Sequence, residues 1–333
     1  MIPAAIALSP LAPLKEIGRL CRLIERYDFD RISISENLML KPAWPVLALV
    51  AEHTKRVQVG PMVVSPFYYH PALIAENIAL IDEISEKRAF LGIGRGAFLE
   101  MLGIEIKEPI LAVREAIQIV KNLLAGLRGD YRGRVFRITE QAFLRWKPPR
   151  KKIPIIIGAQ GLKMAELAGE VASGLDTGFM INPDHMRSVK DSVEKGARQA
   201  GRNPGEVEIS FGAITSISSD RGAAIRLAKR HTARFITSLM RIPGFPHIEE
   251  RELRALRMAV ERGDGEAVAR AISDETIGKI CIAGTPQDVI GQIEGLIEAG
   301  ANGIGFVHPL GPDREEAVKL IGGKILPYFK GSS

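Results

Sequence analysis

The sequence is poor in cysteine and has no long apolar run. Its 333 residues include two cysteines, Cys21 and Cys281, which lie far apart and without metal-ligand spacing. We therefore expect two reduced core thiols in a cytoplasmic protein, because a disulfide framework needs more cysteines. No apolar run approaches the roughly 20 residues of a membrane span, and the N-terminus lacks the basic start of a signal peptide.

The motifs of hydrolases and metal enzymes are also missing. G-x-S-x-G and H-E-x-x-H do not occur, and the six histidines are dispersed, so we expect no metal site. The 45 basic and 39 acidic residues give a formal charge of +6. The densest basic cluster, residues 147–152, is short and sits between two proline signals, which predicts a solvated loop and no nucleic-acid partner. A mildly basic surface suits an anionic small molecule.

What the sequence does contain is a regular alternation of strand-like and helix-like segments. Between the strand-like runs lie amphipathic stretches, and eight strands each followed by a helix are typical of a parallel sheet. The count and length favour an α/β fold, a (β/α)8 TIM barrel formed by one domain, residues 1–333. A doubly wound open sheet is the alternative. The strands are expected at 2–8, 31–35, 57–64, 89–93, 153–157, 175–181, 207–217 and 303–307, with insertions near 126–150 and 241–279.

A glycine-bounded turn follows the fifth predicted strand. Gly158, Ala159, Gln160 and Gly161 lead directly into a helix, so bare backbone N–H groups can face an anion there. Lys163 is placed to add positive charge. An ordinary turn that needs glycine for its backbone angles explains the same pattern, and both interpretations stay open.

A second glycine-rich segment follows the fourth predicted strand. Gly92, Gly94 and Gly96 alternate with Ile93 and Arg95, which lets a flat ligand or another backbone approach closely. The spacing differs from the dinucleotide-binding G-x-G-x-x-G, because the third glycine is misplaced. A purely structural need for glycine is the alternative.

Three polar residues end predicted strands, where barrel enzymes place their catalytic groups. Glu36 and Asn37 follow the second strand, and His308 ends the eighth. A carboxylate at a barrel mouth can act as acid, base or hydrogen-bond acceptor, while a helix-capping or surface role explains Glu36 equally well. A lone histidine at a strand end is more often a packing or capping residue than a catalyst.

Taken together, these segments resemble the bacterial-luciferase-like superfamily, in particular its coenzyme F420-dependent branch typified by methylene-tetrahydromethanopterin reductase. The resemblance runs from about residue 20 to 315. It rests on 27–30 with 34–36, 60–66 with 70–71, 88–94, 102–104, 109 with 114–116, 153–164, 282–286 and 309–313.

The resemblance implies a luciferase-like barrel with the cofactor at the C-terminal mouth and a homodimer or larger assembly. It implies a non-prolyl cis peptide at Met62-Val63, next to Ser65, bulging against the cofactor ring. Glu36 would lie near that ring. The segments 92–95 and 158–161 would line the ring and its phosphate-bearing side chain.

The same comparison reveals two departures. Ala7 stands where the methanopterin reductases carry a glutamate, and Asn37 replaces a histidine that commonly follows an acid. The leading hypothesis is an F420-dependent oxidoreductase that transfers a hydride to or from a small organic substrate, with Glu36, Asn37 and His308 as the groups that handle protons or face substrate. An FMN-dependent monooxygenase and a cofactor-binding paralogue without catalysis are the alternatives.

Overall fold

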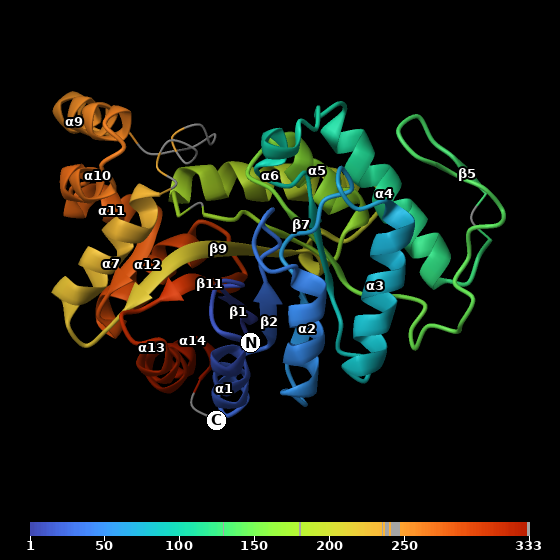
Figure 1. Ribbon diagram of the computed structural model, residues 1–333, viewed down its shortest axis with the longest axis horizontal. Coiled ribbons are helices and arrows are strands. Elements are labelled where there is room, and N and C mark those ends of the chain that lie inside the picture. The colour runs from blue at the N-terminus through green and yellow to red at the C-terminus, as the bar shows by residue number, and fades with distance from the viewer. Residues whose placement is uncertain (129, 180, 235, 237–239, 241–246, 332–333) are drawn as a thin grey trace.

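The computed structural model describes residues 1–128, 130–179, 181–234, 236, 240 and 247–331. Its centre is a nearly closed barrel of parallel strands surrounded by helices (Figure 1). The barrel strands are β1 (Ala4–Leu8), β2 (Arg31–Ile34), β3 (Gln58–Pro61), β4 (Leu91–Gly94), β7 (Ile155–Gly158), β8 (Gly174–Asp176), β9 (Glu208–Ile217) and β11 (Gly303–Leu310).

The strands are arranged in the order β3-β2-β1-β11-β9-β8-β7-β4. Two isolated parallel bridges, Val59 with Ala89 and Val64 with Ile93, connect the first and last members of that order. The sheet is therefore curled into a barrel and is not an open doubly wound sheet, as the count of eight strands predicted. Parallel strands covered by helices are buried on both faces, which explains their apolar runs.

Helices cover the barrel, most of them in the amphipathic stretches expected from the sequence; the two helices after residue 313 were not predicted. The covering helices are α1 (Leu14–Ile24), α2 (Ala43–Glu52), α3 (Pro71–Ile84), α4 (Pro109–Leu124), α5 (Leu162–Val171), α6 (Pro183–Gln199), α7 (Arg221–Ala233), α12 (Pro286–Glu298), α13 (Arg314–Leu320) and α14 (Leu326–Lys330). Within the described ranges, no helix is both long and apolar enough to cross a membrane. Both cysteines are buried free thiols, as expected.

Two strands end earlier than the sequence predicted. The third was expected to continue to residue 64, but β3 ends at Pro61, and the cis peptide Met62-Val63 follows it. The sixth was expected to reach residue 181, but β8 ends at Asp176. Gly178 has a φ of 63°, a left-handed conformation that turns the chain out of the sheet.

The first excursion from the barrel is a short hairpin, β5 (Tyr131–Arg132) with β6 (Arg137–Ile138), which projects from one side of the molecule (Figure 1). Glu115 of α4 fixes it, because its buried carboxylate accepts hydrogen bonds from the N–H groups of Arg134, Val135 and Phe136 at 2.8–3.0 Å. A hairpin of two-residue strands has little cohesion of its own, so this carboxylate supplies its anchor.

The basic cluster 147–152 is not entirely the solvated loop that the sequence predicted. Arg150 turns inward, and its Nε and Nη2 atoms donate to the fully buried Asp82 of α3 at 2.5–3.1 Å. Nη2 also donates to the carbonyl of Ala89, 2.7 Å away. The reason is that Asp82 would otherwise be a buried carboxylate without a compensating charge.

The second excursion lies on the opposite side of the molecule from the hairpin (Figure 1). Its described helices are α9 (Glu250–Glu261), α10 (Gly265–Ala271) and α11 (Asp274–Ile280), followed by the strand β10 (Cys281–Gly284). β10 pairs with the last residues of the long strand β9, and these elements enclose a second hydrophobic cluster that includes Ile225, Leu256 and Ile277. Extra helices were predicted here; residues 241–246 of that segment lie outside the described residues.

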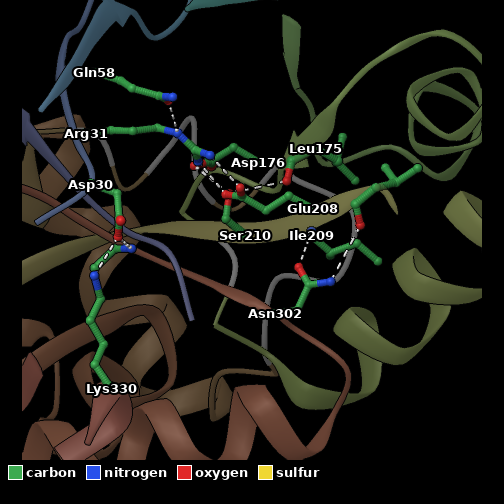
Figure 2. Close-up of polar contacts among 12 residues, drawn as sticks. Asp30, Arg31, Gln58, Leu175, Asp176, Glu208, Ile209, Ser210, Asn302 and Lys330 are labelled. Atoms are coloured by element: carbon green, nitrogen blue, oxygen red, sulfur yellow. Dashed lines mark hydrogen bonds and ion pairs between the residues drawn. The ribbon is translucent and has the colours of Figure 1, made fainter. Parts of the chain in front are cut away.

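Paired charges close the N-terminal end of the barrel (Figure 2). Arg31, the first residue of β2, donates from both terminal nitrogens to Glu208, the first residue of β9, at 2.5 and 2.6 Å. Its Nε donates to Gln58 at 3.1 Å, and the guanidinium lies 5.9 Å from the ring centroid of Phe90. We call Arg31, Glu208 and Gln58 the barrel floor. Nε, Nη1 and Nη2 of this arginine each donate to a side chain, so its charge is both paired and hydrogen-bonded.

Candidate functional site

The end of the third strand carries the cis peptide Met62-Val63 that the family resemblance implies. Val63 lies against the fourth and fifth strand ends: a Cβ at Gly158 would be 2.5 Å from Val63 Cγ1, and one at Gly94 would be 3.1 Å from its Cγ2. The structure therefore brings three predicted site segments, 62–63, 92–94 and 158–161, into contact at the C-terminal mouth.

Ser65 connects the third and fourth strand ends. Its hydroxyl donates to the carbonyl of Arg95 at 2.6 Å and accepts from the N–H of Phe67 at 3.1 Å. A Cβ at Gly96 would lie 2.7 Å from the Cβ of Ser65, so glycine is needed for the two loops to approach this closely. The guanidinium of Arg95 remains exposed.

The glycines of these strands are required for packing within the protein. A Cβ at Gly92 would lie 2.1 Å from the carbonyl oxygen of Pro61, and one at Gly94 would lie 2.6 Å from that of Gly158. These contacts are with backbone and are too close for any larger residue. The structural interpretation of the glycines therefore holds for Gly92, Gly94 and Gly158.

Gly161 is different. A Cβ there would meet nothing within 4 Å, and its φ of −85° suits any residue. It is the N-cap of α5, and no side chain caps that helix, while the N–H groups of Met164 and Ala165 bond to its carbonyl. The open space lies at the positive end of a helix dipole, with Lys163 exposed on the first turn. The turn can therefore still be interpreted as an anion site.

Glu36 combines a capping role with a perturbed acidity. Its Oε2 accepts from the N–H of Ala43 at 2.6 Å, which caps α2 where the N-cap residue, Pro42, cannot. Burial raises the pKa of Glu36, and the hydrogen bond from Ala43 opposes that rise. The capping interpretation made from the sequence is therefore confirmed, and an acid–base role of Glu36 stays a prediction.

Two tyrosines that the sequence did not single out as site residues surround Glu36. Burial raises the pKa of Tyr68 and of Tyr69, and the nearby carboxylate of Glu36 raises both further. Tyr69 also packs edge-on against Trp44, with ring centroids 6.3 Å apart. The indole nitrogen of Trp44 is buried and has no hydrogen-bond partner among the residues that the structure describes. The signal for this cluster is the Tyr68-Tyr69 pair directly after the third strand.

His308 and Asn37 stand apart from this cluster. His308 packs edge-on against His231 of α7, with ring centroids 5.4 Å apart. Burial lowers the pKa of each imidazole to about 4, with further lowering of the His308 pKa by Arg314 and of the His231 pKa by His308. Asn37 is half-buried, and its carbonyl closes a turn with the N–H of Leu40. In the described part of the chain, no hydrogen bond, ion pair or ring contact joins His308 to Glu36 or to the glycine segments.

These features can be compared with known proteins. A family model of the luciferase-like monooxygenases matches residues 2–303. The chain belongs to this family. A 5,10-methylenetetrahydromethanopterin reductase of Archaeoglobus fulgidus is 33% identical, with 95% of this chain and 96% of the relative covered. An F420-dependent glucose-6-phosphate dehydrogenase of Microbacterium testaceum is 27% identical over 92% of this chain and 91% of its own.

A solved structure of the family has the same architecture. The coenzyme F420-dependent tetrahydromethanopterin reductase of Methanopyrus kandleri superposes with a TM-score of 0.91 at 27% identity, covering 99% of both chains. This agreement confirms the luciferase-like TIM barrel that the strand count and the resemblance predicted.

Proposed function

We propose that this protein is a coenzyme F420-dependent oxidoreductase that transfers a hydride between the deazaflavin and a small organic substrate. The observation that supports it most is the meeting of Val63, Gly94 and Gly158 at the barrel mouth, beside the open N-terminus of α5. The relative at 33% identity is a pterin reductase and the relative at 27% identity is an F420-dependent dehydrogenase, which supports the same chemistry.

The residues present fit such a cofactor. Gly161 leaves free space at an uncapped helix N-terminus, and Lys163 and Arg95 are exposed cations, which together suit a phosphate-bearing side chain. We propose that the segments 62–65, 92–95 and 158–163 hold the cofactor. When bound, the deazaflavin supplies the two-electron hydride chemistry.

The protein's own part is orientation and proton handling. Since Oε2 of Glu36 is engaged by the N–H of Ala43, Oε1 is the oxygen left to hold or release a proton. The raised pKa of Glu36 brings its acidity closer to neutral pH, where a general acid is most effective. Asn37 and His308 are assigned as second candidates for substrate contact.

Binding titrations test the cofactor. F420 should bind to the purified protein with higher affinity than FMN, measured by fluorescence quenching under anaerobic conditions. Tight FMN binding without F420 binding would favour the monooxygenase alternative instead. F420 binding with no hydride exchange to any acceptor would favour the non-catalytic paralogue.

The substrate class is proposed from the relatives and from one departure. Ala7, on the inside of β1, pairs in register with Ser33 and Val307 and provides no carboxylate. A methylene-tetrahydromethanopterin reductase activity that relied on a glutamate at this position would be slow here. Reduced F420 assayed against that pterin and against small ketones would separate the candidates.

We also propose that the protein is a cytoplasmic homodimer or a larger homo-oligomer. α2 and α3, which pack together, expose an apolar surface that includes Pro45, Leu73 and Leu80, the two leucines being 48% and 49% exposed. Sedimentation should show a dimer that dissociates in Leu73→Glu/Leu80→Glu. The control Met258→Glu changes an exposed apolar residue on α9 and should not dissociate it.

A further inference from the structure

The Gly158–Gly161 turn is held by residues that follow the next strand, β8. The N–H of Ala159 donates to the carbonyl of Asp176 at 2.9 Å. The carbonyl of Gln160 lies 2.9 Å from Nε2 of His185, on the first turn of α6. The side chain of Gln160 rests on Gly178, where a Cβ would lie 3.0 Å from its amide nitrogen.

The contact with the carbonyl of Gln160 determines which nitrogen of the His185 imidazole carries the hydrogen. A carbonyl oxygen only accepts hydrogen bonds, so Nε2 of His185 must carry the hydrogen. Peptide planarity then fixes a second group. In a trans peptide the carbonyl of Gln160 and the N–H of Gly161 point in opposite directions, so a carbonyl held by His185 sets the direction of the Gly161 N–H.

Asp176 supports the same turn from below. Its carboxylate accepts from the N–H of Gly178 at 2.7 Å and from the hydroxyl of Ser210 at 3.4 Å, next to the barrel floor (Figure 2). Burial raises the pKa of Asp176 to about 6, and the Gly178 hydrogen bond opposes that rise. By accepting from the N–H of Gly178, the carboxyl group stabilises the left-handed Gly178 on which Gln160 rests.

We propose that His185 is a positioning residue: by holding the carbonyl of Gln160 it aims the N–H of Gly161 into the open space at the start of α5, and so sets the affinity for the phosphate-bearing side chain of the cofactor. This inference rests on the proposed function for its ligand. It assigns to α6 a role in a site whose other groups come from the strand ends and from α5.

The test compares His185→Leu, His185→Gln and Ser188→Ala, the last being a control on the same helix. The probes are F420 and the same deazaflavin with an unphosphorylated ribityl chain. We expect His185→Leu to weaken F420 binding about tenfold, as the loss of one hydrogen bond implies. The unphosphorylated probe should bind the variant and the parent equally. His185→Gln, whose amide can donate to the same carbonyl, should recover most of the loss.

Two further measurements separate positioning from general damage. In the F420-bound protein, amide hydrogen exchange at Gly161 should be faster in His185→Leu, where the N–H is no longer held towards the phosphate, and unchanged in Ser188→Ala. At saturating F420, kcat should be close to that of the parent while KM for F420 rises. Equal affinity of the parent and His185→Leu for F420, or equal weakening for both probes, would overturn the inference. Failure of the parent to bind F420 would instead refute the proposed function, and unchanged Gly161 exchange would overturn the positioning role on its own.

Discussion

The two ends of the barrel use charge in opposite ways. At the N-terminal floor, Arg31 and Glu208 are bound to each other at two positions and shielded from solvent. At the C-terminal mouth, Arg95 and Lys163 are exposed, and Glu36 has one carboxylate oxygen engaged.

The difference indicates that the N-terminal end stabilises the barrel and that the C-terminal end is available to bind a ligand. Charges at the floor are paired and hydrogen-bonded, so they stabilise one arrangement of the strands and offer nothing to a ligand. Charges and N–H groups at the mouth are left for a ligand, at the end where barrel enzymes carry out chemistry. Asp30 is another paired charge. Its carboxylate accepts hydrogen bonds from the N–H of Ala4 and from Nζ of Lys330, each at 2.6 Å, and so holds segments near both ends of the chain together.

The largest effect should come from breaking the floor. Arg31→Met leaves Glu208, whose side chain is 16% exposed, without its partner, which should lower the free energy of unfolding by up to about 3–5 kcal/mol. Denaturant unfolding monitored by circular dichroism measures this. Lys55→Met is the matched control, because the Lys55–Glu86 pair at 3.9 Å is 78% exposed on both sides and should contribute little. Equal, small losses for both variants would show that the floor is not a stabilising element.

A glycine pair at the mouth sharpens the comparison. Gly158→Ala places a Cβ 2.5 Å from Val63, so the strand ends must separate, and we expect a loss of about 1–3 kcal/mol in stability together with weaker cofactor binding. Gly161→Ala meets no atom within 4 Å and should leave stability nearly unchanged. Thermal unfolding and F420 titration of both variants measure this. Equal stability of the two variants would contradict the packing of Val63 between the strand ends.

The His231–His308 pair should make stability depend on pH. Both imidazoles have a pKa of about 4 when folded, against about 6.5 when unfolded, so between these values the unfolded chain binds more protons. Stability should therefore fall as the pH drops from 6.5 to 4, by up to about 1.4 kcal/mol per pH unit for each imidazole. Asp176, whose pKa is raised to about 6, acts in the opposite direction and is common to all variants.

Unfolding of the parent and of His308→Phe across that pH range isolates this contribution. The variant should show a weaker decline below pH 6.5, because one buried imidazole no longer has to remain neutral. An unchanged slope would show that folding does not lower the pKa of His308.

The smallest effect on stability is expected for Glu36→Gln. The amide oxygen can still accept from the N–H of Ala43, so the unfolding free energy should change by less than about 1 kcal/mol. Turnover with reduced F420 should fall much more, because the amide cannot hold a proton for transfer. Parent-like turnover would leave Glu36 with a capping role only.

Much of this fold was predictable from local sequence patterns, because the barrel strands are apolar runs that alternate with segments of helical periodicity. Contacts between segments that lie far apart in the sequence were not predictable. Nothing near Arg150 in the sequence indicates that it pairs with Asp82, and nothing near Glu115 indicates that it holds the hairpin. At the site, the resemblance correctly implied the cis peptide, and position along the strands predicted that residues 62–63, 92–94 and 158–161 converge. The packing of His308 against α7 was not predictable, because nothing near either histidine in the sequence indicates that His231 and His308 meet.

The central claim is that the mouth formed by Val63, Gly94 and the Gly158–Gly161 turn binds a deazaflavin cofactor. Anaerobic titration of the parent protein with F420 and with FMN, repeated on Gly158→Ala and Gly161→Ala, tests it most directly. We predict tight F420 binding by the parent and weaker binding by both variants. Gly158→Ala separates the strand ends, and the Cβ of Gly161→Ala enters the space assigned to the phosphate-bearing side chain. Failure of the parent to bind F420, or equal affinity of both variants and the parent, would contradict it.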